Sequence, residues 1–429
     1  MREMKNSGIE WIGEIPVNWN IKRVKAVLCE RNESNNPIQT GKILSLTNDR
    51  GVIPYEEKGD VGNKSKEDLT GYKLAYPGDI VLNSMNVFIG SVGLSSYFGC
   101  VSPVYYMLYP RNKNDSVSFF NYLFQTKELQ TKLHGYGNGI MEIRMRIQMS
   151  KLNSVQLPVP PSDVQQKIAD YLDCKCSQID AIIARQQEVI EKLKAYKLSV
   201  ITEAVTKGLN PNVPMKDSGV EWIGEIPEHW AIHKFCWDYS AMLGKMLDAK
   251  RITGEHLRPY IKNADVQWDG INFENLDEMD FPDEEKERYT ICPGDLMVCE
   301  GGEIGKCSIV PDGVPENIYY QKALHRVRKR HPDSGNIHFL CKVIYCMAKN
   351  NCLNTSPEKA TIAHLPGDAL SQLRIPAPPI SEQDQIAEYL NDKCTEIDRL
   401  SVRKQETIDK LIEYKKSLIY EVVTGKKEV

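Results

Sequence analysis

A glycine-rich stretch at residues 300–308, Glu-Gly-Gly-Glu-Ile-Gly-Lys-Cys-Ser, is the part of this sequence that comes nearest to a phosphate-binding loop. Such a loop needs a glycine five positions before its second glycine, and a Ser or Thr after its lysine to hold magnesium. Glu300 and Cys307 occupy those two positions here. We therefore expect a hairpin loop at this place rather than a nucleotide site.

The other residues that could do chemistry are not spaced for it. Residues 282–286, Pro-Asp-Glu-Glu-Lys, are too close together for two strands to present them around a metal, so we expect an acidic surface turn. The eight His and twelve Cys lack metal-ligand spacing, which favours reduced thiols. No Asn/Asp-Pro-Pro-aromatic motif marks a base methyltransferase, and no nucleophile pairs with a base. The sequence predicts a chain with no catalytic residues, metal or cofactor of its own.

Two basic clusters remain as candidates for binding. Arg144 and Arg146 follow the glycine-rich residues 135–139, and a run from His325 to His331 ends a predicted strand. Alternation along that strand places Arg326 and Arg328 on one face. There they could neutralise phosphates or bind guanine edges. The alternative is a solvated charged edge that prevents strand pairing. The net charge of −4 neither supports nor excludes a nucleic-acid partner.

These clusters lie in two stretches with a common outline, residues 20–157 and 231–374. Each has a Pro-Gly-Asp turn, at 77–79 and 293–295, that leads into a predicted strand. A glycine-punctuated loop, another strand, a helix-like segment and a polar loop follow in the same order. We predict two copies of one α/β domain with matching frameworks and different loops, as expected where loops carry function.

A Pro-x-Pro-Pro hinge follows each domain, at residues 158–161 and 376–379, an offset of 218. Each hinge leads into about 45 residues without proline, in which apolar residues recur at heptad spacing. This pattern predicts two long helices that form a coiled coil. The predicted seam comprises Leu172, Ile179, Gln186, Leu193, Val200, Leu390, Ile397, Lys404, Leu411 and Leu418, and its polar members are at equivalent positions. A second apolar row comprises Ile182, Val189, Tyr196, Leu400 and Tyr414.

A tryptophan motif precedes each domain. Residues 7–16, Ser-Gly-Ile-Glu-Trp-Ile-Gly-Glu-Ile-Pro, and Trp19 recur with one substitution at 218–227 and Trp230. The chain is thus a tandem repeat with the segments 1–19 (tryptophan motif), 20–157 (domain), 158–207 (hinge and long helix), 208–230 (repeated motif), 231–374 (domain) and 375–429 (hinge and long helix). If the apolar rows face each other, the second helix must run back. We therefore predict an antiparallel, pseudo-twofold α+β arrangement with neighbouring termini.

Targeting signals are not visible in the 429 residues. No apolar run approaches the ~20 residues of a membrane helix, and the first residues lack the apolar core of a signal peptide. We expect a cytoplasmic protein.

The sequence closely resembles the DNA-specificity subunit of prokaryotic type I restriction–modification enzymes over essentially its full length. The resemblance rests on the doubled tryptophan motif, the doubled hinge with its Gln-x-x-Ile-Ala-x-Tyr-Leu helix start, and the Pro-Gly-Asp turns. One departure is Asp163-Val164-Gln165, where the family usually has a Glu-Gln pair, as at Glu382-Gln383. This difference should matter little to the fold.

The resemblance implies that each domain is a target recognition domain for one half of a bipartite, asymmetric DNA site. The long helices would separate the domains and dock two methyltransferase subunits, which bind S-adenosylmethionine and flip the target adenine. Restriction subunits dependent on Mg and ATP could join to cut unmethylated DNA in host defence. This chain would supply specificity without catalysis.

Base-reading positions vary within the family, so the candidate DNA-binding residues are chosen by loop position and chemistry. Amide and Arg side chains suit base edges, and Lys suits phosphate. The candidates are Asn83, Ser84, Asn86, Tyr136, Asn138, Arg144 and Arg146 in the first domain, and Glu300, Lys306, Gln321, Arg326, Arg328 and Lys359 in the second. Two alternatives stay open: a coiled-coil scaffold that binds only proteins, and a self-contained DNA enzyme.

Overall fold

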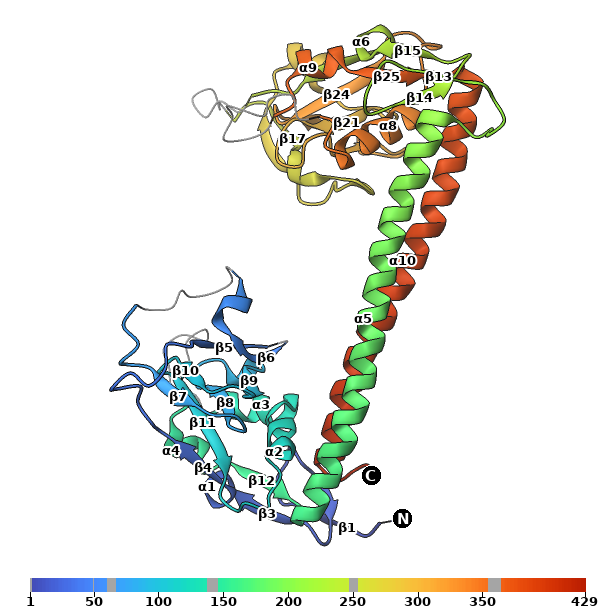
Figure 1. Ribbon diagram of the computed structural model, residues 1–429. Coiled ribbons are helices and arrows are strands. Elements are labelled where there is room, and N and C mark those ends of the chain that lie inside the picture. The colour runs from blue at the N-terminus through green and yellow to red at the C-terminus, as the bar shows by residue number, and fades with distance from the viewer. Residues whose placement is uncertain (1, 49, 60–66, 137–145, 247–253, 354–363) are drawn as a thin grey trace. The chain divides into compact units, whose positions relative to one another are not determined.

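The computed structural model describes residues 2–48, 50–59, 67–136, 146–246, 254–353 and 364–429, which form two compact units (Figure 1). Unit 1 comprises residues 1–187 and 405–429, and unit 2 comprises residues 188–404. Each unit therefore contains one α/β domain and one half of each long helix. Among the described residues, no helix is long and apolar enough to cross a membrane.

A four-stranded antiparallel sheet forms the centre of each domain. Its strand order in unit 1 is β4 (Leu28–Arg31), β11 (Tyr105–Pro110), β8 (Ile80–Asn83) and β9 (Val92–Leu94). The order in unit 2 is β16 (Tyr239–Leu243), β24 (Leu324–Lys329), β21 (Leu296–Cys299) and β22 (Cys307–Ile309). The Pro-Gly-Asp turn precedes the third strand of the order in both sheets, so the predicted common framework is confirmed.

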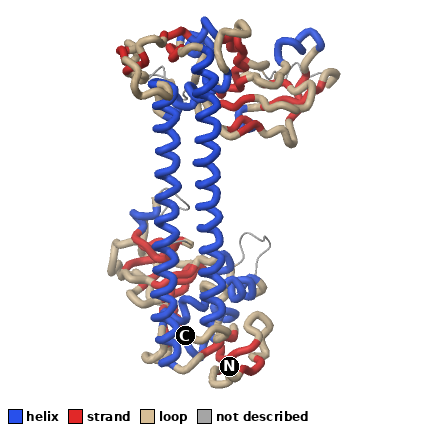
Figure 2. The backbone as a smooth tube through the Cα atoms, turned by 90° about the vertical axis from the view of Figure 1, so that its right-hand side faces the viewer, coloured by secondary structure: helices blue, strands red, loops and turns tan. Residues whose placement is uncertain are grey.

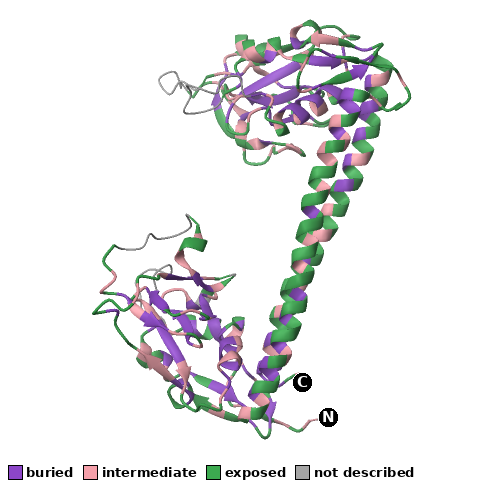
Figure 3. Cartoon of the chain, in the orientation of Figure 1, coloured by how far each residue is buried: buried purple, intermediate pink, exposed green. Residues whose placement is uncertain are grey.

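Helices cover these sheets differently in the two units. Unit 2 has one helix, α8 (Ile337–Lys349), whereas the corresponding segment of unit 1 forms α2 (Val117–Phe124) and α3 (Lys127–His134). Buried Thr126 lies between the two helices of unit 1, and its hydroxyl donates to the carbonyl of Leu123 at 2.7 Å. The buried residues gather in the sheets and these helices (Figure 3).

Shorter elements complete each unit. Unit 1 has β1 (Met4–Asn6), β2 (Glu14–Pro16), β3 (Asn20–Arg23), α1 (Val24–Val27), β5 (Leu44–Thr47), β6 (Gly51–Pro54), η1 (Tyr55–Lys58), β7 (Lys73–Ala75), η2 (Val87–Ile89), β10 (Gly99–Val101), α4 (Met149–Leu152) and β12 (Gln156–Val159). Unit 2 has β13 (Met215–Asp217), β14 (Glu225–Pro227), β15 (Ala231–Lys234), α6 (Phe235–Asp238), β17 (Leu257–Ile261), η4 (Asn263–Asp265), β18 (Val266–Gln267), β19 (Gly270–Ile271), β20 (Asp277–Asp280), η5 (Asp283–Glu285), α7 (Lys286–Tyr289), β23 (Tyr319–Tyr320), α9 (Gly367–Gln372) and β25 (Arg374–Ala377).

Each proline hinge begins within a strand and ends at the start of a long helix. Pro158 in β12 pairs with β3, and Pro376 in β25 pairs with β15. Both sheets have only two strands, so a residue without an N–H donor is tolerated there. The long helices α5 (Ser162–Lys207) and α10 (Ile380–Val423) start directly after the hinges.

The two long helices run antiparallel within each unit (Figures 1 and 2). In unit 1, Lys415 of α10 binds Asp180 of α5 at 2.7 Å. In unit 2, Lys197 of α5 binds Asp398 of α10 at 2.7 Å. In both units the residues beyond these pairs continue in opposite directions within a shared core. The predicted antiparallel helix pair is therefore confirmed.

Burial along the helices follows the first apolar row. Its members Leu172, Ile179, Leu390, Ile397 and Leu418 are buried, and Gln186, Leu193, Val200, Lys404 and Leu411 are half-buried. The second predicted row, Ile182, Val189, Tyr196, Leu400 and Tyr414, is exposed and does not belong to the seam. Positions one residue later are turned inward instead, including Ile183, Ile190, Ser401 and Ile408. A heptad row is too coarse to distinguish these neighbouring positions.

Each tryptophan motif packs on the end of a long helix. Gly425 follows α10 with φ +74°, and a Cβ there would lie 2.5 Å from Pro16 and 3.1 Å from Trp19. Gly208 follows α5 with φ +75°, and a Cβ there would lie 3.1 Å from Trp230. Glycine suits both places because it adopts positive φ and lets the indole approach. The predicted closeness of the termini is confirmed within unit 1 (Figure 1).

A buried glutamine ties each helix start to its domain. The side chain of Gln165 accepts from the N–H of Ser116 and donates to the carbonyl of Pro160, both at 3.0 Å. Gln383 makes the equivalent pair of bonds in unit 2, both at 2.9 Å. The glutamine of the repeated helix start thus satisfies two buried backbone groups in each unit.

Gln165→Leu is expected to destabilise unit 1 by roughly 1–3 kcal/mol, because two buried backbone groups lose their partners. Exposed Gln166 supplies the control, and Gln166→Leu should change the free energy of unfolding by less than about 0.5 kcal/mol. Urea denaturation of the two variants measures the difference. Equal losses would contradict the role given to Gln165.

Candidate nucleic-acid interface

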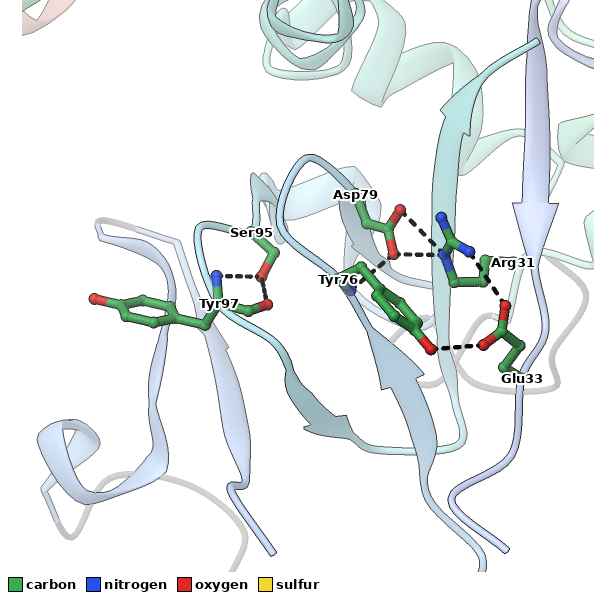
Figure 4. A network of polar contacts seen from close by, with 6 residues as sticks. All are labelled: Arg31, Glu33, Tyr76, Asp79, Ser95 and Tyr97. Carbon is green, nitrogen blue, oxygen red and sulfur yellow. Dashed lines mark hydrogen bonds and ion pairs between the residues drawn. The ribbon is translucent and has the colours of Figure 1, made fainter. Parts of the chain in front are cut away.

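The Pro-Gly-Asp turn of unit 1 is held by an aspartate–arginine pair (Figure 4). Asp79 accepts from the N–H of Tyr76 at 2.9 Å and from Nε of Arg31 at 3.0 Å. The Arg31 guanidinium lies 4.5 Å from the ring of Tyr76 and 4.8 Å from that of Tyr109. Glu33 accepts from both Arg31 and the Tyr76 hydroxyl. These contacts fix the turn to the edge strand β4.

Unit 2 makes the same pair from a different strand. Asp295 accepts from the N–H of Cys292 at 2.8 Å and from Nε and Nη2 of Arg328 at 2.5 and 2.7 Å. Strand register places Arg328 of β24 where β11 has Tyr109, and Met242 of β16 where β4 has Arg31. Each turn aspartate thus pairs with an arginine, but the arginine lies on the edge strand β4 in unit 1 and on the inner strand β24 in unit 2.

This geometry corrects the prediction for the second basic cluster. Arg326 and Arg328 do share a face, since both donate to the carbonyl of Thr290. That face packs on the protein: Arg326 is only 5% exposed, and Arg328 is bound to Asp295. Burial keeps Arg326 from a base edge, and the ion pair with Asp295 engages Nε and Nη2 of the half-exposed Arg328. The local sequence pattern could not reveal the partner Asp295, which lies in the turn before another strand, β21.

Burial and the ion pairs together shift the pKa values of these groups. Desolvation raises the pKa of Asp79 above its ordinary value, although the N–H of Tyr76 and the charge of Arg31 act to lower it. The hydrogen bond to Asp295 is the main cause that raises the pKa of Arg328. The pairs therefore fix framework geometry at a desolvation cost.

The predicted residues at the end of β8 are also mostly framework. Asn83 and Ser84 are buried. The side chain of Asn83 accepts from the N–H of Met85 at 3.0 Å, and the hydroxyl of Ser84 donates to the carbonyl of Val104 at 2.6 Å. These internal bonds contradict a base-reading role for Asn83 and Ser84. Asn86 is half-buried and directly precedes η2.

Among the predicted residues of unit 1 that the structure describes, Arg146 is the most exposed. Its side chain is exposed, and the next residue, Ile147, bonds the end of β8 through Ser84. Lys73 of β7 lies near it: burial lowers the pKa of Lys73, and the charge of Arg146 contributes. Half-buried Tyr136 lies apart from this pair, in a groove with Trp11 and Lys132.

Unit 2 brings different residues to its loops. Glu300 is half-buried, and its carbonyl accepts from Leu365 at 2.7 Å. Lys306 is buried, with its ammonium 3.5 Å from Gln267, so it is poorly placed to meet a phosphate. Half-buried Gln321 adjoins Lys322, which is exposed. The other predicted residues, Asn138, Arg144 and Lys359, lie outside the described residues.

Three exposed or half-exposed basic residues were not predicted from the sequence: Lys73, Lys322 and His364. Their neighbours come from distant strands, so no local spacing marks them. Over the described ranges, no group of three His, Cys, Asp or Glu is arranged to hold a metal.

Comparison with known proteins finds similarity to one family. The family model of the type I restriction modification DNA specificity domain matches residues 16–193. The chain is 23% identical to the putative type I restriction enzyme MjaX specificity subunit of Methanocaldococcus jannaschii, over 97% of this chain and 95% of that protein. It is 24% identical to the MjaVIII specificity subunit of the same organism, over 80% and 76% of the two chains.

Solved structures agree on the fold. A chain from a type I R-M system, in a study of its complex assembly and conformational transition, matches with a TM-score of 0.74 at 13% identity, over 96% of this chain and 99% of that one. The HsdS subunit from Thermoanaerobacter tengcongensis matches with a TM-score of 0.53 at 13% identity, over 96% and 98%.

Proposed function

We propose that this chain is a specificity subunit of a type I restriction–modification system, as its similarity to such subunits supports, and that each of its domains binds one half of a bipartite, asymmetric DNA site. The observation that carries the proposal is the doubled framework. The two sheets share strand order and the Asp–Arg pair, while the loops at their ends differ in sequence and in exposed residues. Two copies of one scaffold with different loops suit two different half-sites.

The exposed cations supply the electrostatic part of binding. Arg146 in unit 1 and Lys322 in unit 2 are exposed near the loops and carry charges suited to phosphate or guanine. Arg326 is buried and takes no part in direct contact, and Arg328 is bound to Asp295. Binding should therefore weaken with salt, since each phosphate contact releases counterions.

Sequencing of methylated adenines in cells that contain this chain and its methyltransferase tests the proposed function. A two-part motif that disappears when this chain is deleted supports it. Methylation that continues without the chain, or a chain that binds its partner but directs no methylation, would favour a coiled-coil scaffold instead.

The partners supply the chemistry in this proposal. Two methyltransferase subunits bind S-adenosylmethionine and flip the adenine, and restriction subunits that use Mg and ATP cut unmodified DNA. This chain selects the sequence and does not catalyse. The exposed apolar row of α5 and α10 is the surface that we assign to the methyltransferase, because apolar side chains outside the seam favour a partner helix.

Tyr196 and Tyr414 test this docking surface. They occupy equivalent helix positions and are 57% and 53% exposed. Tyr196→Asp with Tyr414→Asp should reduce methyltransferase co-purification at least tenfold, because central aromatic anchors are typically worth 2 kcal/mol or more.

The matched control is Glu191→Lys with Asp409→Lys, which changes exposed residues about 140° around each helix. The control should retain the partner at the wild-type ratio. Retention of the partner by the tyrosine variant would move the docking surface elsewhere.

A further inference from the structure

Both backbone polar groups of one buried residue of unit 1, Ile147, are hydrogen-bonded. The N–H of Ile147 donates to the carbonyl of Ser84 at 2.9 Å, and its carbonyl accepts from the hydroxyl of Tyr106 at 3.0 Å. Ile147 and Ser84 are buried, and Tyr106 lies in the central strand β11. The residue before Ile147 is the exposed Arg146.

Unit 2 repeats this arrangement with different side chains. The N–H of Leu365 donates to the carbonyl of Glu300 at 2.7 Å, and its carbonyl lies 2.8 Å from Nε2 of His325. Leu365 is buried, and His325 lies in the central strand β24 and is 1% exposed. The residue before Leu365 is the exposed His364, which bridges to Gly301.

Strand register makes the two arrangements equivalent. Tyr106 pairs with Leu82, three residues after Asp79, and His325 pairs with Val298, three residues after Asp295. Ser84 and Glu300 each lie five residues after the same aspartates. We call each set, Tyr106–Ile147–Ser84 and His325–Leu365–Glu300, a carbonyl latch.

The acceptor in unit 2 defines the state of His325. A carbonyl can only accept, so Nε2 carries the proton. Desolvation lowers the pKa of His325, which keeps the ring neutral near pH 7. Nδ1 is buried with no hydrogen-bond partner among the described residues, so a second proton there would be unpaired. The imidazole thus serves as a single donor, as the Tyr106 hydroxyl does.

A donor is needed at this position because the carbonyls are buried. An unpaired buried carbonyl costs about 1–3 kcal/mol, and the chain would shift to pair it with water. Such a shift would move the adjoining exposed residue, Arg146 or His364, relative to the sheet. The latch therefore fixes the position of a basic side chain at an edge where the proposed function places DNA.

We propose that Tyr106 and His325 are equivalent positioning residues for DNA recognition. Tyr106 holds Ile147, and thereby the preceding side chain of Arg146, in its DNA-binding position. His325 does the same for His364 through Leu365. The inference rests on the proposed function and extends it to residues that do not themselves touch DNA. It also assigns His364 as the unit 2 counterpart of Arg146.

The test uses the complex with the methyltransferase and measures methyl transfer to duplexes altered in one half-site at a time. Tyr106→Phe removes only the donor of unit 1, and His325→Leu removes that of unit 2. Each variant should lose discrimination roughly tenfold at its own half-site, with the other half-site unchanged. His325→Gln, which keeps an N–H in reach of the carbonyl, should restore discrimination. Tyr109→Phe, on the same strand as Tyr106, is the control and should behave as wild type.

Melting temperatures of the same variants separate positioning from loss of folding. Unchanged discrimination in both donor variants, or an equal loss at both half-sites, would overturn the latch. An inactive, unfolded His325→Leu variant leaves the decision to Tyr106→Phe, a smaller change. If domain exchange transfers half-site recognition but Tyr106→Phe keeps full discrimination, only the latch fails. If domain exchange transfers nothing, the proposed function itself fails.

Discussion

Arg31→Met is expected to destabilise unit 1 by about 3–5 kcal/mol at neutral pH. The cause is Asp79, whose side chain is only 2% exposed and would remain as a buried carboxylate without its cation. Arg23→Met is the control, because Arg23 is exposed on β3. It should change the free energy of unfolding by less than about 0.5 kcal/mol. Chemical denaturation followed by a unit 1 probe measures both.

The loss should shrink as the pH falls. Burial already raises the pKa of Asp79, and removal of Arg31 takes away a charge that lowers it. Folded Asp79 then binds a proton at a pH where the unfolded chain has released it, so stability rises with acidity through that window. A penalty for Arg31→Met that grows between pH 7 and pH 5 would contradict an unpaired Asp79 as its cause.

The second unit supplies a compensating change. Unit 2 has methionine at the Arg31 position and arginine at the Tyr109 position. Arg31→Met combined with Tyr109→Arg should therefore recover most of the lost stability, because the new arginine reaches Asp79 as Arg328 reaches Asp295. If the double variant is no more stable than Arg31→Met, the two Asp–Arg pairs are not interchangeable.

Repeated local patterns allowed most of the architecture to be predicted. The doubled tryptophan motif, hinge and heptad row each contain their own signal, and the structure places Trp19 and Trp230 on equivalent helix ends. The second apolar row, which includes Ile182 and Tyr196, has the heptad spacing of a seam but faces away from the partner helix, so its residues are exposed. Only the actual crossing of two helices decides which of two neighbouring rows is buried.

The candidate site was predicted less well, for a physical reason. Arg326 and Arg328 look like a basic surface in sequence, but both donate to the carbonyl of Thr290, and Arg328 is also paired with Asp295 of the Pro-Gly-Asp turn. Ser84 looks like a polar loop residue, but its hydroxyl donates to the carbonyl of Val104, 20 positions away in the sequence. Such partners are set by sheet register, which the sequence does not display. Arg146 remains a prediction, and its exposure is what a binding residue requires.

Exchange of one whole domain should have the largest effect on recognition. If residues 20–157 are replaced by the equivalent segment of a relative with a different target, one half of the recognised sequence should change completely. The first junction leaves Trp19 and its packing against Gly425 with the parent chain. The second falls inside β12, so the relative's β3 must pair with the parent residues Pro158 and Val159. The matched exchange of residues 231–374 should change the other half.

Methylated-adenine sequencing of cells that contain the first exchange and the methyltransferase is the most direct test of independent half-site recognition. The account predicts a two-part motif in which one half is new and the other is that of the parent chain. A motif with both halves changed, or a folded and active exchange with neither half changed, would contradict it.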